Sequence, residues 1–113
     1  KIVSAKSLIL STLLLPLTGG LDIEAVYKHL SGYYKRLKKK RLLDKQYSSV
    51  VSIMEFYGLI FFINNFELEE DEVYEFVLGA LENSNIEKDF RTSDHGLVLE
   101  SFEKFHQSIN EEN

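Results

Sequence analysis

Cysteine and tryptophan are absent from this 113-residue chain, and it contains one proline and one methionine. Without cysteine there is no disulfide framework, no thiolate zinc site and no cysteine nucleophile. Long hydrophobic runs are also missing, because the longest, residues 8–17, is interrupted by Ser11, Thr12 and Pro16 and falls short of the roughly 20 residues of a membrane span. No small-residue cleavage site follows this run, so we interpret it as a buried helix within a single small domain.

Charge is divided unevenly along the chain. Residues 1–58 carry ten Lys/Arg against four Asp/Glu, a net charge of +6, and residues 59–113 carry three against fourteen, a net charge of −11. Six of the ten basic residues lie in the basic block, Lys35–Arg41. This asymmetry predicts a polyanion or an acidic protein as a partner.

Helical spacing of apolar residues predicts three helices in the first half of the chain. The first, over residues 8–17, is apolar nearly all round and is expected at the centre of the core. The second begins after the N-cap residue Asp22 and runs into the basic block. The third spans Asp44–Tyr57, with Gly58 placed to end it.

A short β-hairpin is expected next. Leu59–Ile63 is rich in β-branched and aromatic side chains, Asn64-Asn65 is typical of a tight turn, and Phe66–Leu68 would be the returning strand. Three helices followed by a hairpin is the winged-helix order, in which the third helix and the hairpin are the usual contact surfaces. The predicted fold is therefore mostly α with a small β-hairpin, a winged helix-turn-helix with additional C-terminal helices.

Two further helices are expected in the acidic half. Residues 69–72 would open the first of them, where negative charge interacts favourably with the helix dipole, and residues 83–85 would end it. After a polar connection through residues 91–93, a last amphipathic helix spans Asp94–Ile109, with Leu97, Val98, Phe102, Phe105 and Ile109 facing inward. We assign residues 1–83 to the winged-helix core and residues 84–113 to a helical extension packed on the same domain.

The residues from Ser7 to Asn83 resemble a known domain. The matching pattern consists of the apolar helix Leu8–Leu15, the segment Asp22–Tyr27 leading the second helix, the segment Tyr47–Ile60 that closes on Gly-Leu-Ile, and the acidic opening Glu70–Val73. This pattern is similar to the C-terminal winged-helix domain of the replication initiators, the family of cell division control protein six and origin recognition complex subunit one.

The resemblance implies a role without catalysis for this chain. In that family the winged helix follows an AAA+ ATPase module, and the whole protein loads the minichromosome maintenance (MCM) helicase at origins. The chain starts at Lys1, which we interpret as the start of a domain excised from a longer protein, and it has no Gly-x-x-x-x-Gly-Lys-Ser/Thr motif. We therefore expect no enzymatic activity and no cofactor in this fragment.

The same resemblance implies its partners. They are double-stranded DNA, contacted through its backbone, together with origin recognition complex subunits and the MCM helicase in the nucleus. No membrane and no small-molecule substrate are expected.

The basic block is the main candidate for a DNA contact. Lysines and arginines that displace counterions from phosphates contribute affinity that falls with salt, and a basic patch beside a helix-turn-helix is the expected footprint. A solvated helix end and a nuclear-import signal are the alternatives. The third helix offers serines but no Arg or Asn for bidentate base contacts, so sequence-specific readout is not expected. The candidate DNA-binding residues are Lys35, Lys38, Lys39, Lys40, Arg41, Lys45, Gln46, Ser48 and Ser49.

Aromatic and acidic residues around the hairpin are the candidates for partner contacts. They are Phe62, Phe66, Glu69, Glu70 and Asp71. Alternation along a strand turns some hairpin side chains outward, and the alternative for the phenylalanines is packing as a lid over the helices. The carboxylates either begin a helix or form a docking surface for a basic partner, and they lack the ligand pattern of a calcium loop.

No catalytic or metal-binding pattern is found in the sequence. His29, His95 and His106 are spread along the chain without an i, i+4 partner, so we expect each to be exposed to solvent and not to bind a metal. No nucleophile-base pair or phosphate-binding glycine loop occurs either. The rival to the DNA-binding interpretation is a protein-protein adaptor without direct DNA binding, which the −11 charge of the second half favours because it repels DNA.

Overall fold

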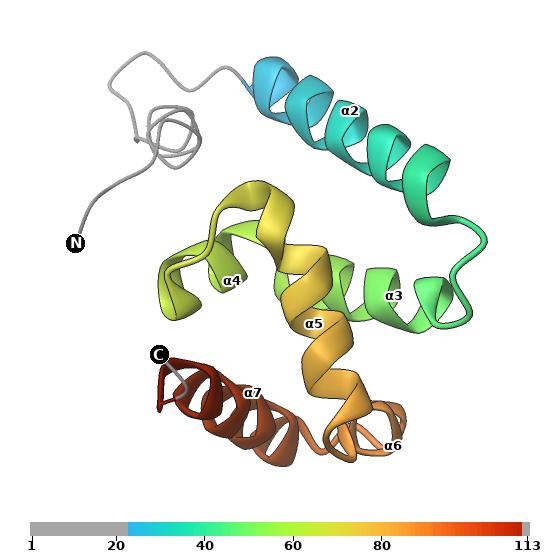
Figure 1. Cartoon of the computed structure of the whole chain (residues 1–113). Coiled ribbons are helices and arrows are strands. Elements are labelled where there is room, and N and C mark those ends of the chain that lie inside the picture. The colour runs from blue at the N-terminus through green and yellow to red at the C-terminus, as the bar shows by residue number, and fades with distance from the viewer. Residues whose placement is uncertain (1–22, 112–113) are drawn as a thin grey trace. The chain divides into compact units, whose positions relative to one another are not determined.

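The computed structural model describes residues 23–111, and within that range every regular element is helical (Figure 1). The elements are α2 (Ile23–Arg41), α3 (Tyr47–Tyr57), α4 (Leu59–Phe66), the 3₁₀ turn η1 (Glu70–Glu72), α5 (Val73–Glu82), α6 (Ile86–Arg91) and α7 (His95–Glu111). The expected helix over residues 8–17 and the Asp22 cap lie outside the described residues. The chain divides into two compact units, residues 1–47 and residues 48–113.

In the first unit, α2 forms where helical spacing predicted the second helix. Tyr33 and Leu37, four residues apart, are its buried side chains. The Tyr33 ring meets Tyr34 edge-on, with the ring centroids 5.2 Å apart. The last turn of α2 carries the basic residues 38–41, whose positive charge interacts favourably with the C-terminal end of the helix dipole.

In the second unit, α3 and α4 meet at a sharp bend around Gly58. The two helix axes differ in direction by 82°. The Gly58 N–H donates to the Met54 carbonyl oxygen at 2.9 Å and closes the last turn of α3. Gly58 has a φ of 97°, a region that side chains with a Cβ rarely adopt, so glycine permits the bend. The predicted end of this helix at Gly58 is confirmed.

The predicted β-hairpin is wrong, because residues 59–66 form helix α4 and residues 23–111 contain no strand. The buried side chains of α4 are Leu59, Phe62, Ile63 and Phe66, at positions i, i+3, i+4 and i+7. That spacing forms one helical face, whereas a strand would bury alternate residues. Burial of this face outweighs the β propensity of the segment, which is a weak preference that tertiary packing overrides. Without a hairpin, the described part of the chain is not a winged helix.

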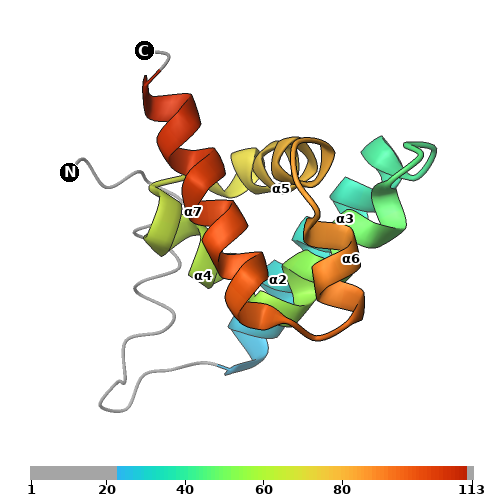
Figure 2. The same ribbon diagram turned by 90° about the horizontal axis from the view of Figure 1, so that it is seen from below.

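Phenylalanines from three helices form the core of the second unit. Phe62 and Phe66 on α4, Phe76 on α5 and Phe102 on α7 are buried, and their rings contact one another. Figure 2 shows α7 beside α4, in agreement with the ring centroids of Phe62 and Phe102, which lie 5.2 Å apart. The C-terminal helices are therefore part of one core with α4 and α5.

A glycine on α5 allows α7 to approach closely. A Cβ added to Gly79 would lie 2.7 Å from the Cζ atom of Phe105. That distance is well inside ordinary van der Waals contact, so the Phe105 ring occupies the space that a side chain at position 79 would need.

The acidic residues 69–72 open a helix, as their position in the sequence predicted. The Glu69 N–H donates to Oε1 of Glu72 at 2.7 Å, an interaction typical of a helix N-terminus. The 3₁₀ turn η1 then leads directly into α5, which ends at Glu82 before the predicted stop at residues 83–85. The sequence pattern predicted no element over the residues of the short helix α6, in which Ile86 is fully buried.

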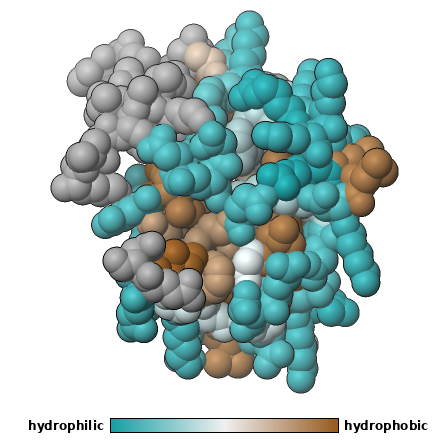
Figure 3. All heavy atoms as spheres, in the orientation of Figure 1, coloured by the Kyte–Doolittle hydropathy of each residue, from teal (hydrophilic) through white to brown (hydrophobic). Residues whose placement is uncertain are grey.

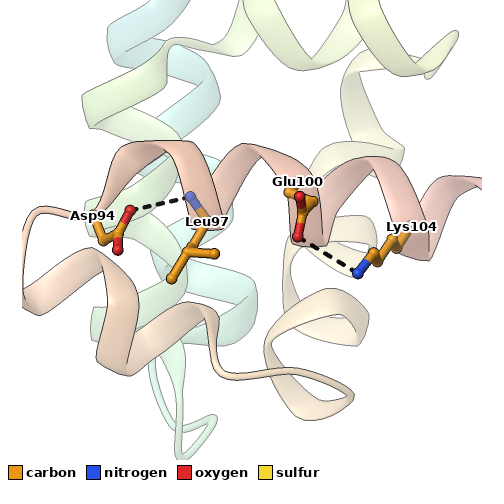
Figure 4. A network of polar contacts seen from close by, with 4 residues as sticks. All are labelled: Asp94, Leu97, Glu100 and Lys104. Carbon is orange, nitrogen blue, oxygen red and sulfur yellow. Dashed lines mark hydrogen bonds and ion pairs between the residues drawn. The ribbon is translucent and has the colours of Figure 1, made fainter.

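Helix α7 begins at His95, one residue after its cap. Oδ1 of Asp94 accepts the Leu97 N–H at 3.3 Å, and one turn further on Glu100 pairs with Lys104 at 3.5 Å on the exposed side (Figure 4). Val98 and Phe102 are buried as predicted, but Leu97 is 45% exposed. The buried face of α7 therefore passes through Val98 and Phe102, and Leu97 lies beside it.

Candidate functional site

Lysine side chains gather at the C-terminal end of α2. Lys35, Lys38 and Lys39 lie at positions i, i+3 and i+4, which places them on one face of the helix. With Lys40, Leu42 and Leu43 they line one surface hollow. We call the four residues Lys35, Lys38, Lys39 and Lys40 the basic cluster. All four are exposed to solvent.

The electrostatics of the first unit favour anions. Residues 23–47 carry eight Lys/Arg against two Asp/Glu, a net charge of +6. Arg41 is half-buried and lies 3.7 Å from Oδ2 of Asp44, where it ties the end of α2 to the following turn. Because this arginine already has a carboxylate partner, the four lysines are better placed than Arg41 to hold a phosphate group.

The other candidate DNA contacts differ in their surroundings. Lys45 and Ser48 are exposed, and Gln46 is half-buried. The Ser49 hydroxyl donates to Oε2 of Glu87 on α6 at 2.6 Å. A phosphate that contacted Ser49 would lie close to the negative charge of Glu87 and would be repelled by it. The structure therefore does not support Ser49 as a DNA contact.

Three of the residues predicted as partner contacts are buried. Phe62 and Phe66 belong to the core, with exposures of 0% and 4%, because the helical turn of α4 directs both toward α7. Glu70 is 5% exposed. Glu69 is half-buried and Asp71 is exposed. The prediction of a partner surface over Phe62, Phe66 and Glu70 is therefore wrong.

The second unit carries a surface cluster of rings that the sequence analysis did not identify. Phe56, at the end of α3, is 58% exposed. Its ring stacks on the His95 imidazole, with centroids 4.9 Å apart and planes inclined by 8°, and meets Phe90 of α6 edge-on at 5.4 Å. The signal in the sequence was the position of Phe56, which lies off the apolar stripe of its helix. His95 was expected to be exposed to solvent, and the structure shows it half-buried in this cluster.

Tyr57 connects this cluster to the core. Its hydroxyl lies 2.8 Å from Nδ1 of His95, and its ring contacts Phe62 and Phe102 edge-on. A phenol and an imidazole nitrogen can each donate or accept, so the tautomer of His95 sets the direction of this hydrogen bond. Burial raises the pKa of Tyr57 above its ordinary value of 10.0.

The raised pKa predicts a pH-dependent loss of stability that depends on Tyr57. Above pH ~10 the unfolded chain releases the phenolic proton of Tyr57 while the folded chain retains it. The free energy of unfolding is therefore unaffected by this group below that pH and decreases as pH rises toward the pKa of Tyr57 in the folded chain. Tyr57→Phe should lower the free energy of unfolding by about 0.5–1.5 kcal/mol near neutral pH, because the hydrogen bond is lost. It should also show a smaller further loss at high pH than the unchanged chain.

Urea unfolding followed by circular dichroism, at neutral pH and on both sides of pH ~10, measures both effects. Tyr27→Phe is the matched control, since it removes a tyrosine that is exposed on α2. Equal pH dependence in the Tyr57 and Tyr27 variants would contradict the assignment.

Within residues 23–111, no group of three or more His, Asp or Glu side chains is placed to hold a metal ion. Among these residues no single helix has the length and hydrophobicity to cross a membrane, although α3 and α4 together pass that test as a pair bent by 82°. Hydrophilic side chains cover much of the face seen in Figure 3 and separate its apolar areas.

Comparison of the chain with known protein families, characterised proteins and solved structures finds no match.

Proposed function

We propose that this chain is a non-catalytic helical domain of a DNA replication initiator, and that its basic cluster binds the phosphate backbone of duplex DNA. The observation that carries the proposal is the basic cluster itself, four exposed lysines at one helix end within a segment, residues 23–47, of net charge +6. The link to replication rests on the sequence resemblance of the residues from Ser7 to Asn83. The proposal includes origin recognition complex subunits and the MCM helicase as protein partners.

The proposed contact is electrostatic and independent of base sequence. Each lysine that neutralises a phosphate releases condensed counterions, so the logarithm of the binding constant should fall with the logarithm of salt concentration by about 0.9 per contact. Lysine acts as a point charge and does not distinguish bases when it contacts only phosphates. The domain would therefore hold DNA at the origin without selecting its sequence.

Replacing three lysines of the basic cluster tests this proposal. In the variant with Lys38, Lys39 and Lys40 all changed to Ala, we expect duplex affinity at low salt to fall by about tenfold or more and the salt slope to decrease by about 2–3. Fluorescence anisotropy with a labelled duplex at several salt concentrations gives both quantities. Arg41 is kept because of its contact with Asp44.

The matched control changes Lys28, Lys88 and Lys104 to Ala. These exposed lysines lie elsewhere on the chain, and two of them form only exposed i, i+4 ion pairs, with Glu24 and Glu100, that contribute little to stability. Both variants lose the same charge. Equal affinities in the two variants, or no binding by the unchanged chain at low salt, would refute the proposed DNA contact.

A protein adaptor is the second candidate, and the Ser49–Glu87 hydrogen bond favours it. That bond places a carboxylate beside a residue predicted to contact DNA, within a unit whose residues 48–111 carry fourteen Asp/Glu against three Lys/Arg, a net charge of −11. A chain that binds purified MCM helicase but no DNA, and whose binding is unchanged in the triple Lys38, Lys39 and Lys40 variant, would support the adaptor.

A further inference from the structure

An exposed aromatic surface lies where α3, α6 and α7 meet. It consists of Phe56, Phe90, His95 and Leu99, which we call the aromatic patch. Phe56 contacts both Phe90 and His95 through its ring, and Leu99 follows His95 by one helical turn on α7, so the two lie on the same face of that helix. Phe56 and Leu99 are exposed, and Phe90 and His95 are half-buried.

Phe56 is held in place before any partner binds. Its ring stacks on His95, which in turn is fixed by the 2.8 Å hydrogen bond to the Tyr57 hydroxyl, and Phe90 and Tyr57 contact the Phe56 ring edge-on. A side chain restrained in this way loses little conformational entropy on binding, which is the property of an aromatic anchor in a protein interface. An unrestrained surface phenylalanine would lack this advantage.

The charge around the aromatic patch defines the partner that fits it. Glu55 and Asp94 are exposed neighbours of Phe56 and His95, and Glu103 lies one turn beyond Leu99. Arg91 is the chain neighbour of Phe90, and residues 48–111 carry a net charge of −11. This field repels the phosphates of a nucleic acid, although its bases could stack on Phe56. It attracts a protein segment that combines apolar side chains with lysine or arginine.

We propose that the aromatic patch is a docking site for a basic, amphipathic helical segment of a partner protein. Apolar residues of that helix at positions i, i+3 and i+4 would cover Phe56 and Leu99, and its basic residues would face the carboxylates around them. This site shares no residue with the basic cluster, so it would allow the chain to bind a protein and DNA through different residues.

The test uses a defined probe, a labelled synthetic helix of about 14 residues with leucines at positions i, i+3, i+4 and i+7 and lysines elsewhere. A second peptide carries glutamate in place of every lysine. We expect the lysine peptide to bind the full chain and the glutamate peptide to bind at least about tenfold more weakly. We expect Phe56→Ala to weaken binding of the lysine peptide by about tenfold or more, because it removes the anchor.

Tyr27→Ala is the control variant, since Tyr27 is an exposed aromatic residue on α2, outside the aromatic patch. It should bind the lysine peptide as the unchanged chain does. If the lysine peptide binds Phe56→Ala as tightly as the unchanged chain, and this binding disappears at about 0.5 M salt, the attraction is general and electrostatic. That result overturns the proposal. Binding weaker than about 1 mM also overturns it, since no specific site would then exist.

Two further outcomes would assign the patch to another occupant and so overturn the proposal. One is a single-stranded oligonucleotide that binds the chain and loses its affinity in Phe56→Ala, which would indicate base stacking. The other is self-association of the chain, measured by sedimentation, that Phe56→Ala abolishes. Neither outcome depends on the basic cluster, so the DNA-backbone proposal can fail or succeed independently.

Discussion

Phe62→Ala is expected to destabilise the chain by about 3–5 kcal/mol, a large share of the 5–15 kcal/mol by which a domain is typically stable. Phe62 has an exposed fraction of 0%, and its ring meets those of Tyr57, Phe66 and Phe102 from neighbouring turns and from α7. Its removal would leave a cavity bounded by rigid rings, which cannot collapse to fill the space. Urea unfolding monitored by circular dichroism gives the change in free energy.

Phe61→Ala is the matched control for this prediction. Phe61 is the chain neighbour of Phe62 and is half-buried, so its loss should cost about 1–2 kcal/mol, clearly less than the loss of Phe62. In a strand that buried Leu59 and Ile63, Phe61 would face the core and Phe62 would not. A larger cost for Phe61→Ala than for Phe62→Ala would therefore contradict helix α4.

The helices with one apolar stripe were predictable from the sequence. In α3, Val50 and Met54 are buried at the predicted spacing, and in α7 Val98 and Phe102 are buried. Both helices alternate between apolar and polar sides with the period of a helix, so their pattern identifies the element and its buried face together. Their ends were less certain, and α3 begins at Tyr47 instead of Asp44.

The segments without such periodicity were not predictable. Leu59–Ile63 is apolar at every position, so its pattern fits a strand and a helix equally well, and only the burial of Phe62 and Phe66 on one side identifies α4. Helix α6 has six residues and one fully buried side chain, Ile86, which is too little for a periodic signal. Both segments are defined by contacts with residues distant in the sequence.

The basic cluster and the aromatic patch also differ in how far the sequence predicts them. The basic cluster was predictable because consecutive lysines at a helix end cannot all be buried, and the structure exposes them. The aromatic patch depends on Phe56 and His95, which are 39 positions apart in the sequence and meet only through the turn between α6 and α7. A ring pair of this kind has no signature in the sequence beyond a phenylalanine off the apolar stripe.

Asn64→Pro is expected to destabilise the chain by about 3 kcal/mol or more, because Asn64 lies inside α4. Proline removes the backbone hydrogen bond from position 64 to the Ile60 carbonyl oxygen, and its ring clashes with that carbonyl. It also disfavours the helical conformation of Ile63, whose side chain is buried. Thermal unfolding followed by circular dichroism at 222 nm measures both effects. The unfolding midpoint should fall, and the signal of the folded chain should decrease by the equivalent of about one helical turn.

Two milder substitutions separate this helix from a hairpin. Asn64→Ala should leave stability unchanged or raise it by about 0.5 kcal/mol, since alanine favours an exposed helical position. Asn65→Gly should lower stability by up to about 1 kcal/mol, because it weakens the helix and removes the 2.9 Å hydrogen bond from Asn65 Nδ2 to the Phe61 carbonyl oxygen. In a hairpin the same change would create an Asn-Gly turn and raise stability. The sign of the Asn65→Gly effect therefore decides whether residues 59–66 are a helix in solution.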